Sequence, residues 1–216
     1  PDQPVEDRRR SLRAPARRAG RPSPPLSSPG SLFVVTGPSG AGKGTLIRAL
    51  LARCRELEAA VSATTRPLRP GEADGREYYF LSEEEFSRRV AAGEFLEHVV
   101  YVSGQRYGTL NAEVERIFGA GRSCLLELET EGARRVKELR PEAVTVFIAA
   151  PSFDELRRRL EERATESAGE IGERLELARR QTDEAGDFDH VVVNDDVERA
   201  AGELERIVRR ELEGSR

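Results

Sequence analysis

Gly37-Pro38-Ser39-Gly40-Ala41-Gly42-Lys43 decides the fold of this chain, because it directly follows the apolar run Leu32-Phe33-Val34-Val35-Thr36. The apolar, β-branched run predicts a buried strand, and the residues from about 43 to 55 predict a helix. Glycines let backbone amides turn inward around an anion, while the helix N-terminus and the lysine add positive charge. The order of strand, glycine-rich loop and helix therefore predicts a phosphate-binding loop.

The loop predicts an ATP site in which the lysine reaches the β and γ phosphates. In the usual pattern a Ser or Thr follows the lysine directly, but here Gly44 intervenes and Thr45 comes next. The Thr45 hydroxyl, which we expect to contact Mg²⁺ indirectly, is thus displaced by one residue. An ordinary glycine-rich turn is the alternative. The predicted strand before the loop and the predicted helix after it argue against that alternative. The residues predicted to bind ATP here are Gly37, Pro38, Ser39, Gly40, Ala41, Gly42, Lys43, Gly44 and Thr45.

Strand-like runs recur at residues 124–128, 144–148 and 191–193, with helical stretches between them. Strands that alternate with helices predict an α/β fold with a parallel sheet flanked by helices. Ser82 with Glu85, and Ser152 with Glu155, have the spacing of helix-capping boxes.

Composition predicts one globular unit, with 38% hydrophobic and 34% charged residues among 216. The net charge is −4, and because residues 1–30 carry seven Arg against three acidic residues, the rest of the chain is more acidic still. An acidic body disfavours nucleic-acid binding. The two cysteines, Cys54 and Cys124, predict buried free thiols in a reducing compartment. No apolar run has the length of a membrane span, so we expect a cytoplasmic protein without membrane contact.

Residues 1–30 are rich in Arg, Pro, Ala and Ser and predict a disordered tail. The run Arg8-Arg9-Arg10 raises the alternative of an export signal, but no apolar stretch of signal length follows it. An organelle transit peptide stays open as a further alternative, weakened by the acidic residues of the tail.

Between residues 61 and 114 the pattern changes to short runs broken by Pro and Gly, with aromatic residues in strand-like surroundings. This change predicts a smaller mixed lobe inserted into the parallel core. Arg66 and Arg69 lie near hydroxyl groups and suggest an anion site. A solvated charged loop is the alternative, and composition alone favours it.

The phosphate-binding loop and the segment 62–72 together resemble the guanylate kinases of the P-loop nucleoside monophosphate kinase family. The resemblance continues through residues 75–80, 95–97, 104–109 and 193–196 and covers about residues 31–212. It implies a core of residues 31–60, 115–150 and 186–212, a GMP-binding lobe at 61–114 and a helical lid at 151–185.

The resemblance also implies which residues bind GMP. A guanidinium fork and phenolic hydroxyls suit a phosphate, and a carboxylate accepts the N1 and N2 protons of guanine, which adenine lacks. Where the family usually has Asp, this chain has Glu129, and Glu131 stands where Gln is frequent. The implied phosphate-binding residues are Arg66, Arg69, Tyr78 and Tyr107, and the implied base-reading residues are Ser62, Glu97, Thr109 and Glu129.

Arg159 and Arg163 share one face of a predicted helix, and Arg174 follows on the next. A solvated helix face is the alternative reading. The resemblance implies that these arginines close over ATP and the transferring phosphoryl group, and that Asn194 lies by the adenine. The implied catalytic residues are Lys43, Arg66, Arg159, Arg163 and Arg174.

The implied activity is ATP:GMP phosphotransfer in purine nucleotide metabolism and GMP recycling, assisted by Mg²⁺ and without a covalent intermediate. Two other functions stay open. One is a binding module like the guanylate kinase-like domains of scaffolding proteins, and the other is a kinase for another phosphorylated small molecule, such as a ribose bisphosphate. The sequence does not distinguish a monomer from a homo-oligomer.

Overall fold

The computed structural model of this protein describes residues 30–101, 104–162 and 168–214. Of the predicted tail, residues 1–29 lie outside the described part. The strands are β1 Leu32–Thr36, β2 Leu57–Ala59, β3 Ala63–Thr64, β4 Tyr79–Phe80, β5 Phe95–Val100, β6 Arg106–Leu110, β7 Ser123–Glu127, β8 Val144–Ala149 and β9 His190–Val193. The helices are α1 Lys43–Arg53, α2 Glu83–Ala91, α3 Asn111–Gly119, α4 Thr130–Leu139, α5 Phe153–Glu162, α6 Ala168–Asp183 and α7 Val197–Gly214, with a short 3-10 turn at Ala185–Asp187.

The central sheet has five parallel strands in the order β2-β7-β1-β8-β9. Successive side chains of a strand point to opposite faces. Phe33 and Val35 accordingly join one core cluster, while Leu32 and Val34 join the other. A strand buried on both faces needs a continuous apolar run, which is why β1 was legible in the sequence. The predicted α/β class is confirmed.

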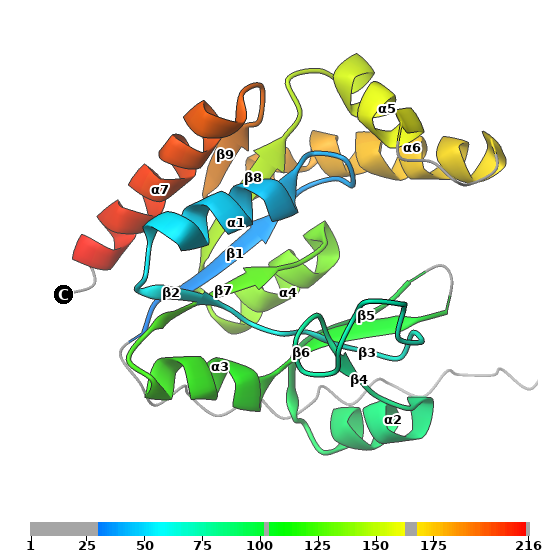
Figure 1. Cartoon of the computed structure of the whole chain (residues 1–216), viewed down its shortest axis with the longest axis vertical. Helices are drawn as coiled ribbons and strands as arrows, with labels where there is room; N and C mark the ends of the chain where they lie inside the picture. The colour runs from blue at the N-terminus through cyan, green and yellow to red at the C-terminus, as the bar shows by residue number, and fades with distance from the viewer. Residues whose placement is uncertain (1–29, 102–103, 163–167, 215–216) are drawn as a thin grey trace, which may run out of the picture.

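Helices cover both faces of this sheet (Figure 1). On one face α1 and α7 pack side by side, with Leu50 and Leu204 fully buried between them and the strands. On the other face α3 and α4 contribute Ile117 and Val136 to the second cluster. The three layers thus bury two hydrophobic clusters, one on each face of the sheet, which hold the carboxyl ends of β1 and β7 in place.

The second sheet has the order β4-β3-β6-β5 and mixes parallel and antiparallel pairs. Its own small core centres on Phe86 of α2, whose ring stacks on Phe95 at a centroid distance of 4.4 Å. The mixed lobe predicted from the change in sequence rhythm is therefore present.

Two predicted helix starts carry the expected caps. The Ser82 hydroxyl accepts the backbone N–H of Glu85 at 3.1 Å before α2, and the Ser152 hydroxyl accepts that of Glu155 at 3.1 Å before α5. Cys54 and Cys124 are buried free thiols, as expected. Desolvation raises the pKa of Cys124, which keeps this thiol protonated.

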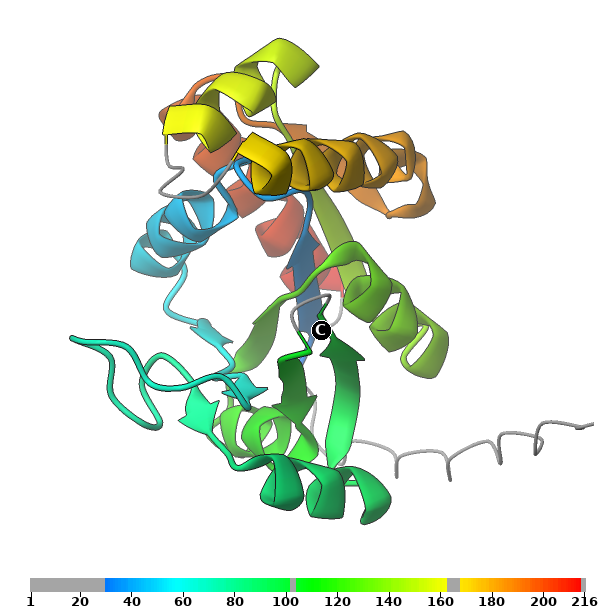
Figure 2. The same ribbon diagram turned by 90° about the vertical axis from the view of Figure 1, so that its right-hand side faces the viewer.

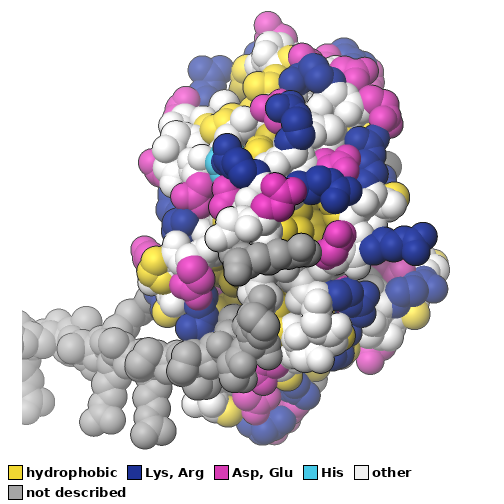
Figure 3. All heavy atoms as spheres, turned by 90° about the vertical axis from the view of Figure 1, so that its left-hand side faces the viewer, with side chains coloured by type: hydrophobic (Ala, Val, Ile, Leu, Met, Phe, Trp, Pro, Cys, Tyr) yellow, Lys and Arg dark blue, Asp and Glu magenta, His cyan; other side chains and the backbone are white. Residues whose placement is uncertain are grey.

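Helices α5 and α6 pack together through Leu156, Leu160 and Ala178. Figure 2 shows these two helices at one end of the molecule and the small sheet with α2 at the other, with the central sheet between them. On the face drawn in Figure 3, basic and acidic side chains are interspersed. None of the helices within the described ranges is both long enough and apolar enough to cross a membrane.

Candidate active site

The phosphate loop, residues 37–44, leaves β1 and enters α1 through glycines in conformations that other residues rarely adopt. Gly42 has φ +91°, and a Cβ there would lie 2.3 Å from Asn194 Nδ2. Gly37 has φ +136°, and a Cβ there would lie 2.2 Å from the carbonyl oxygen of Ile148 on the neighbouring strand β8. Both positions therefore require glycine.

The N-terminus of α1 is open to an anion. Gly42 provides no side-chain cap, and the first turn contains no acidic residue. Lys43 lies in this turn and donates to the carbonyl oxygens of Gly37 at 2.6 Å and Pro38 at 3.2 Å. The backbone amides, the helix dipole and the lysine thus present positive charge at one place.

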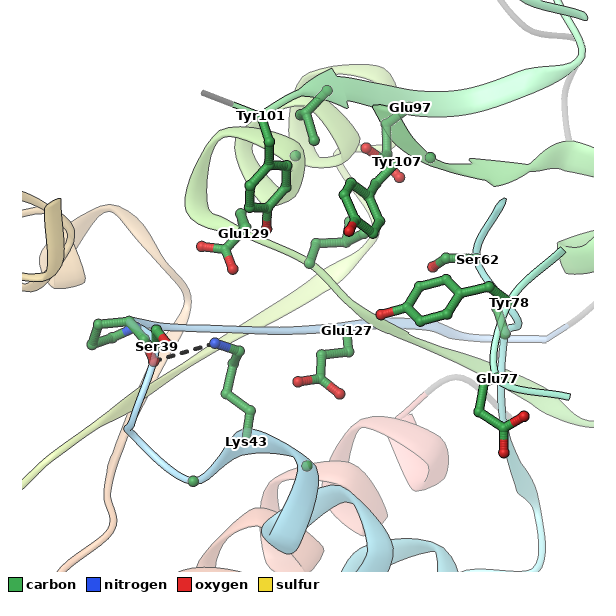
Figure 4. Close-up of a pocket in the computed structure, with 18 of the residues that line it drawn as sticks. Ser39, Lys43, Ser62, Glu77, Tyr78, Glu97, Tyr101, Tyr107, Glu127 and Glu129 are labelled. Atoms are coloured by element: carbon green, nitrogen blue, oxygen red, sulfur yellow. Dashed lines mark hydrogen bonds between the residues drawn. The ribbon is translucent and has the colours of Figure 1, made fainter. Parts of the chain in front are cut away.

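A single cavity of about 530 Å³ joins this loop to the small lobe. Lys43 and Ser39 lie on one side of it, and Tyr101, Tyr107 and Glu97 on the other (Figure 4). The predicted residues that line the cavity are Pro38, Ser39, Gly40, Gly42, Lys43, Gly44, Thr45, Ser62, Tyr78, Glu97, Tyr107 and Glu129.

Glu97 on β5 is the most buried carboxylate of the cavity, with 4% of its surface exposed. Thr109 on the paired strand β6 donates its hydroxyl to Glu97 Oε1 at 2.9 Å. The first turn of α4 passes close by, since a Cβ at Gly132 would lie 3.1 Å from Glu97 Oε2. Burial raises the pKa of Glu97 to about 7, against which the hydrogen bonds from Thr109 act. A ligand that donates hydrogen bonds to this carboxylate would offset the cost of its desolvation.

Arg66 is buried beside the cavity rather than in its wall. Both terminal nitrogens of its guanidinium donate to Glu72, at 2.7 and 2.6 Å, and the guanidinium carbon lies 4.9 Å from the ring centroid of Tyr78. This pairing lowers the pKa of Glu72 to about 2. Arg69 follows on the same loop with an exposed side chain, and its backbone N–H also donates to Glu72, at 2.9 Å. Glu72, which sequence reasoning did not single out, therefore holds the guanidinium of Arg66 and the backbone of Arg69.

Tyr78 and Tyr107 meet edge to face with centroids 5.8 Å apart. Desolvation, with Tyr107 nearby, raises the pKa of Tyr78, so its phenol stays protonated and able to donate. Tyr107 also packs on Tyr101, at a centroid distance of 4.9 Å. Tyr101, another residue that sequence reasoning missed, lies next to Glu129 (Figure 4).

Glu127 is a further cavity residue outside the predicted set. It ends β7, and the parallel register pairs it with Val35 of β1, two residues before the phosphate loop begins at Gly37. Desolvation raises the pKa of Glu127, while Lys43 and Arg48 act in the opposite direction. Its place at the carboxyl end of a strand beside β1 was a signal in the sequence that could have identified it.

Arg159 and Arg174 are not among the residues that line the cavity. Arg159 donates to Glu155 at 2.8 Å and to the carbonyl oxygen of Asn194 at 3.1 Å. Arg174 donates to the Ser39 hydroxyl of the phosphate loop at 3.0 Å. Arg163 lies outside the described residues.

Asn194 is buried and supports the phosphate loop from behind. Its side chain donates to the carbonyl oxygen of Ala41 at 2.7 Å, and its backbone N–H donates to that of Ala149 at 2.7 Å. Among the described residues no cluster of three or more His, Cys, Asp or Glu side chains is arranged as a metal centre.

A parallel sheet with a phosphate loop at its carboxyl edge, and a second lobe that completes one cavity with that loop, defines a nucleotide kinase of the P-loop class. Comparison with known proteins narrows the class. The family model for guanylate kinase matches residues 30–211. This chain therefore belongs to the guanylate kinase family, whose members are phosphotransferases.

Individual relatives agree with this assignment. A guanylate kinase of Rubrobacter xylanophilus is 52% identical over 185 residues, which cover 86% of this chain and 96% of that protein. One of Symbiobacterium thermophilum is 49% identical and covers 85% of this chain and 87% of that protein. The crystal structure of guanylate kinase from Anaplasma phagocytophilum superposes with a TM-score of 0.69 at 34% identity, covering 86% of this chain and 88% of that one.

Proposed function

We propose that this protein transfers the γ-phosphoryl group of ATP to GMP and releases ADP and GDP. The observation that carries the proposal is the single cavity between the phosphate loop and the buried Glu97 carboxylate. One end of this cavity is built for phosphates, and the other offers acceptors for the ring protons of guanine. A transfer between two nucleotides needs both ends in one space.

In the proposed reaction an oxygen of the GMP phosphate forms a bond to the γ-phosphorus in line with the oxygen that leaves with ADP. Lys43 and the amides of the phosphate loop bind the ATP phosphates. Arg66, Arg69, Tyr78 and Tyr107 hold the GMP phosphate, and Arg174 is carried on α6 against Ser39, within reach of the transferring group. Arg159 and Arg163 would add charge when the lid closes. The acceptor is already ionised, so the step needs no protein nucleophile or general base.

Base selection is assigned to the carboxylate end of the cavity. Ser62, Glu97, Thr109 and Glu129 would accept or donate hydrogen bonds along the edge of guanine. A base without matching donors leaves the desolvation of the buried Glu97 carboxylate offset by Thr109 alone among the described residues, and that penalty disfavours the base. Asn194 acts on the ATP side by holding the backbone of the phosphate loop.

The residues present fit Mg²⁺. The Thr45 hydroxyl and the Glu127 carboxylate both line the cavity next to Lys43, and oxygen ligands of this kind suit the ion. When bound with ATP, Mg²⁺ neutralises charge on the β and γ phosphates. The two buried free thiols support a reducing compartment such as the cytoplasm.

A coupled assay of ADP release tests this function, with GMP, AMP and a ribose bisphosphate offered as acceptors. We expect release with GMP, little with AMP, and loss of activity when EDTA removes divalent ions. Folded protein that releases no ADP with GMP would instead be a binding module. Release with the ribose bisphosphate but not with GMP would assign the other kinase function.

A further inference from the structure

Helix α6 of the lid reaches the acceptor end of the cavity through Gln181. This side chain is 5% exposed, and its Nε2 donates to Glu129 Oε2 at 2.8 Å. Glu129 is the residue directly before α4, where the chain turns from the end of the strand β7, and it lines the cavity. A residue of the lid is thus bonded to a carboxylate assigned to the guanine edge.

The same helix contacts the phosphate loop. Arg174 donates to the Ser39 hydroxyl at 3.0 Å. Residues 174 and 181 are seven positions apart, which in a helix is about two turns and about 10 Å on one face. Ala178 lies between them and is buried against Leu156 and Leu160 of α5. One face of α6 therefore touches the donor side and the acceptor side of the cavity.

The contact has a clear chemical consequence for Glu129. A glutamate has one more rotatable bond than the aspartate that is usual at this position in the family, so its carboxylate has more conformations to lose on binding. Gln181 occupies Oε2, and Tyr101 lies beside the same group (Figure 4). The amide of Gln181 thereby fixes the Glu129 carboxylate in the wall of the cavity.

We propose that Gln181 is a positioning residue, which holds the Glu129 carboxylate at the guanine edge and couples GMP binding to the position of α6. The inference rests on the proposed function, because it takes Glu129 as part of the GMP site. Arg174 links α6 to the phosphate loop, so the binding of ATP and of GMP each strengthens the other. Linkage makes this effect equal in both directions.

Calorimetric titration with GMP, in the absence and presence of a non-hydrolysable ATP analogue, tests the coupling. Gln181→Met keeps the volume of the side chain and removes the hydrogen bond. We expect it to weaken GMP binding about tenfold and to bring the ratio of the two GMP dissociation constants close to one. Thr182→Ala is the matched control, because within the described residues that hydroxyl donates to the carbonyl oxygen of Ala178 in its own helix, away from Glu129, and it should keep the wild-type ratio.

Glu129→Asp tests the same contact from the other end, since the shortened carboxylate no longer reaches Gln181. It should bring the ratio of the two GMP dissociation constants close to one, as Gln181→Met does. If Gln181→Met does not fold, Glu129→Asp tests the proposal by itself. A wild-type ratio of the two GMP dissociation constants in either folded variant would overturn the proposal, even if that variant binds both nucleotides more weakly. Wild-type protein that does not bind GMP would reject the proposed function itself before any variant is compared.

Discussion

The two ends of the cavity are built in different ways. The phosphate loop is backbone, fixed by glycines at required positions and by Asn194 behind it, and its lysine is bonded to loop carbonyls. The acceptor end is made of side chains from the small lobe and the start of α4, and its central carboxylate, Glu97, is buried at a cost that raises its pKa. The donor end is preformed, whereas the acceptor end is completed by its ligand.

Replacing Lys43 with alanine gives the largest expected effect on this contrast. The cation that faces the β and γ phosphates is lost, while the backbone cradle stays in place. We expect turnover to fall at least a hundredfold, roughly the loss seen when one charge-stabilising donor is removed from an active site. Steady-state assay of ADP release measures it. Lys137→Ala, which removes the ion pair with Asp189 away from the cavity, should leave turnover near wild type, and an equal loss there would point to misfolding.

Glu97→Gln tests the acceptor end. The amide keeps the shape of the side chain but places an N–H₂ donor where guanine needs an acceptor. We expect the preference for GMP over AMP, measured as the ratio of kcat/KM values, to fall by about 5- to 30-fold, which corresponds to about 1–2 kcal/mol for the lost polar pair. The response to ATP concentration should change little. An unchanged base preference would remove Glu97 from the guanine site.

The same variant should alter the dependence of stability on pH. The folded pKa of Glu97, about 7, lies above its ordinary value of 4.5, so the folded state retains this proton longer than the unfolded chain does. Glu97 therefore destabilises the ligand-free fold progressively as pH rises from about 4.5 to 7. Glu97→Gln should gain stability over that window, by at most about 3 kcal/mol, in urea unfolding followed at several pH values. Glu85→Gln is the contrasting case: Arg88 and Arg89 lower the pKa of Glu85 to about 2, so this variant should lose stability relative to the wild type as pH rises from about 2 to 4.5 and show no further change between pH 4.5 and 7.

Gly42→Ala perturbs the donor end through its backbone. The new Cβ would meet Asn194 Nδ2 at 2.3 Å in a conformation with φ +91°, which costs about 1–2 kcal/mol for the conformation alone. We expect KM for ATP to rise about tenfold, with GMP binding in the absence of ATP largely retained. Gly202→Ala makes the same change within α7, where a new Cβ has no heavy atom of the described residues within 4 Å apart from its chain neighbours and the nearby backbone of its own helix. It should leave the binding of ATP and of GMP unchanged. Equal effects of the two variants would show that the loop has no special need for glycine at residue 42.

The donor end could be predicted from sequence because it is local. Strand, glycines, lysine and helix follow one another within about twenty residues, and each conformational demand is visible as a residue type. The acceptor end joins β5, β6, α4 and the loop around Arg66, which tertiary structure alone brings together. Residue patterns only suggested an anion site there, since composition alone favoured a solvated charged loop, and the roles of Glu97 and Glu129 depended on resemblance to a family.

The residues that were missed are partners rather than members of motifs. Glu72 was given no role, yet it holds the guanidinium of Arg66. Gln181 lies 52 residues from Glu129 along the chain, so no spacing rule connects them. Glu127 could have been found, because the register of a parallel sheet places it beside the phosphate loop.

Substitutions at the two helix caps have the smallest expected effect. They compare the acceptor lobe and the lid by their contributions to the stability of the fold. Ser82 caps α2 in the acceptor lobe and Ser152 caps α5 in the lid, each with one hydrogen bond of 3.1 Å. Replacing either with alanine should lower the free energy of unfolding by about 1 kcal/mol, measured by urea titration. Only Ser152→Ala should also lower kcat, because α5 carries Arg159. Glu155 of the same helix and the carbonyl oxygen of Asn194 hold this arginine in place. A lower kcat for Ser82→Ala as well would mean that the acceptor lobe, and not the lid alone, limits turnover.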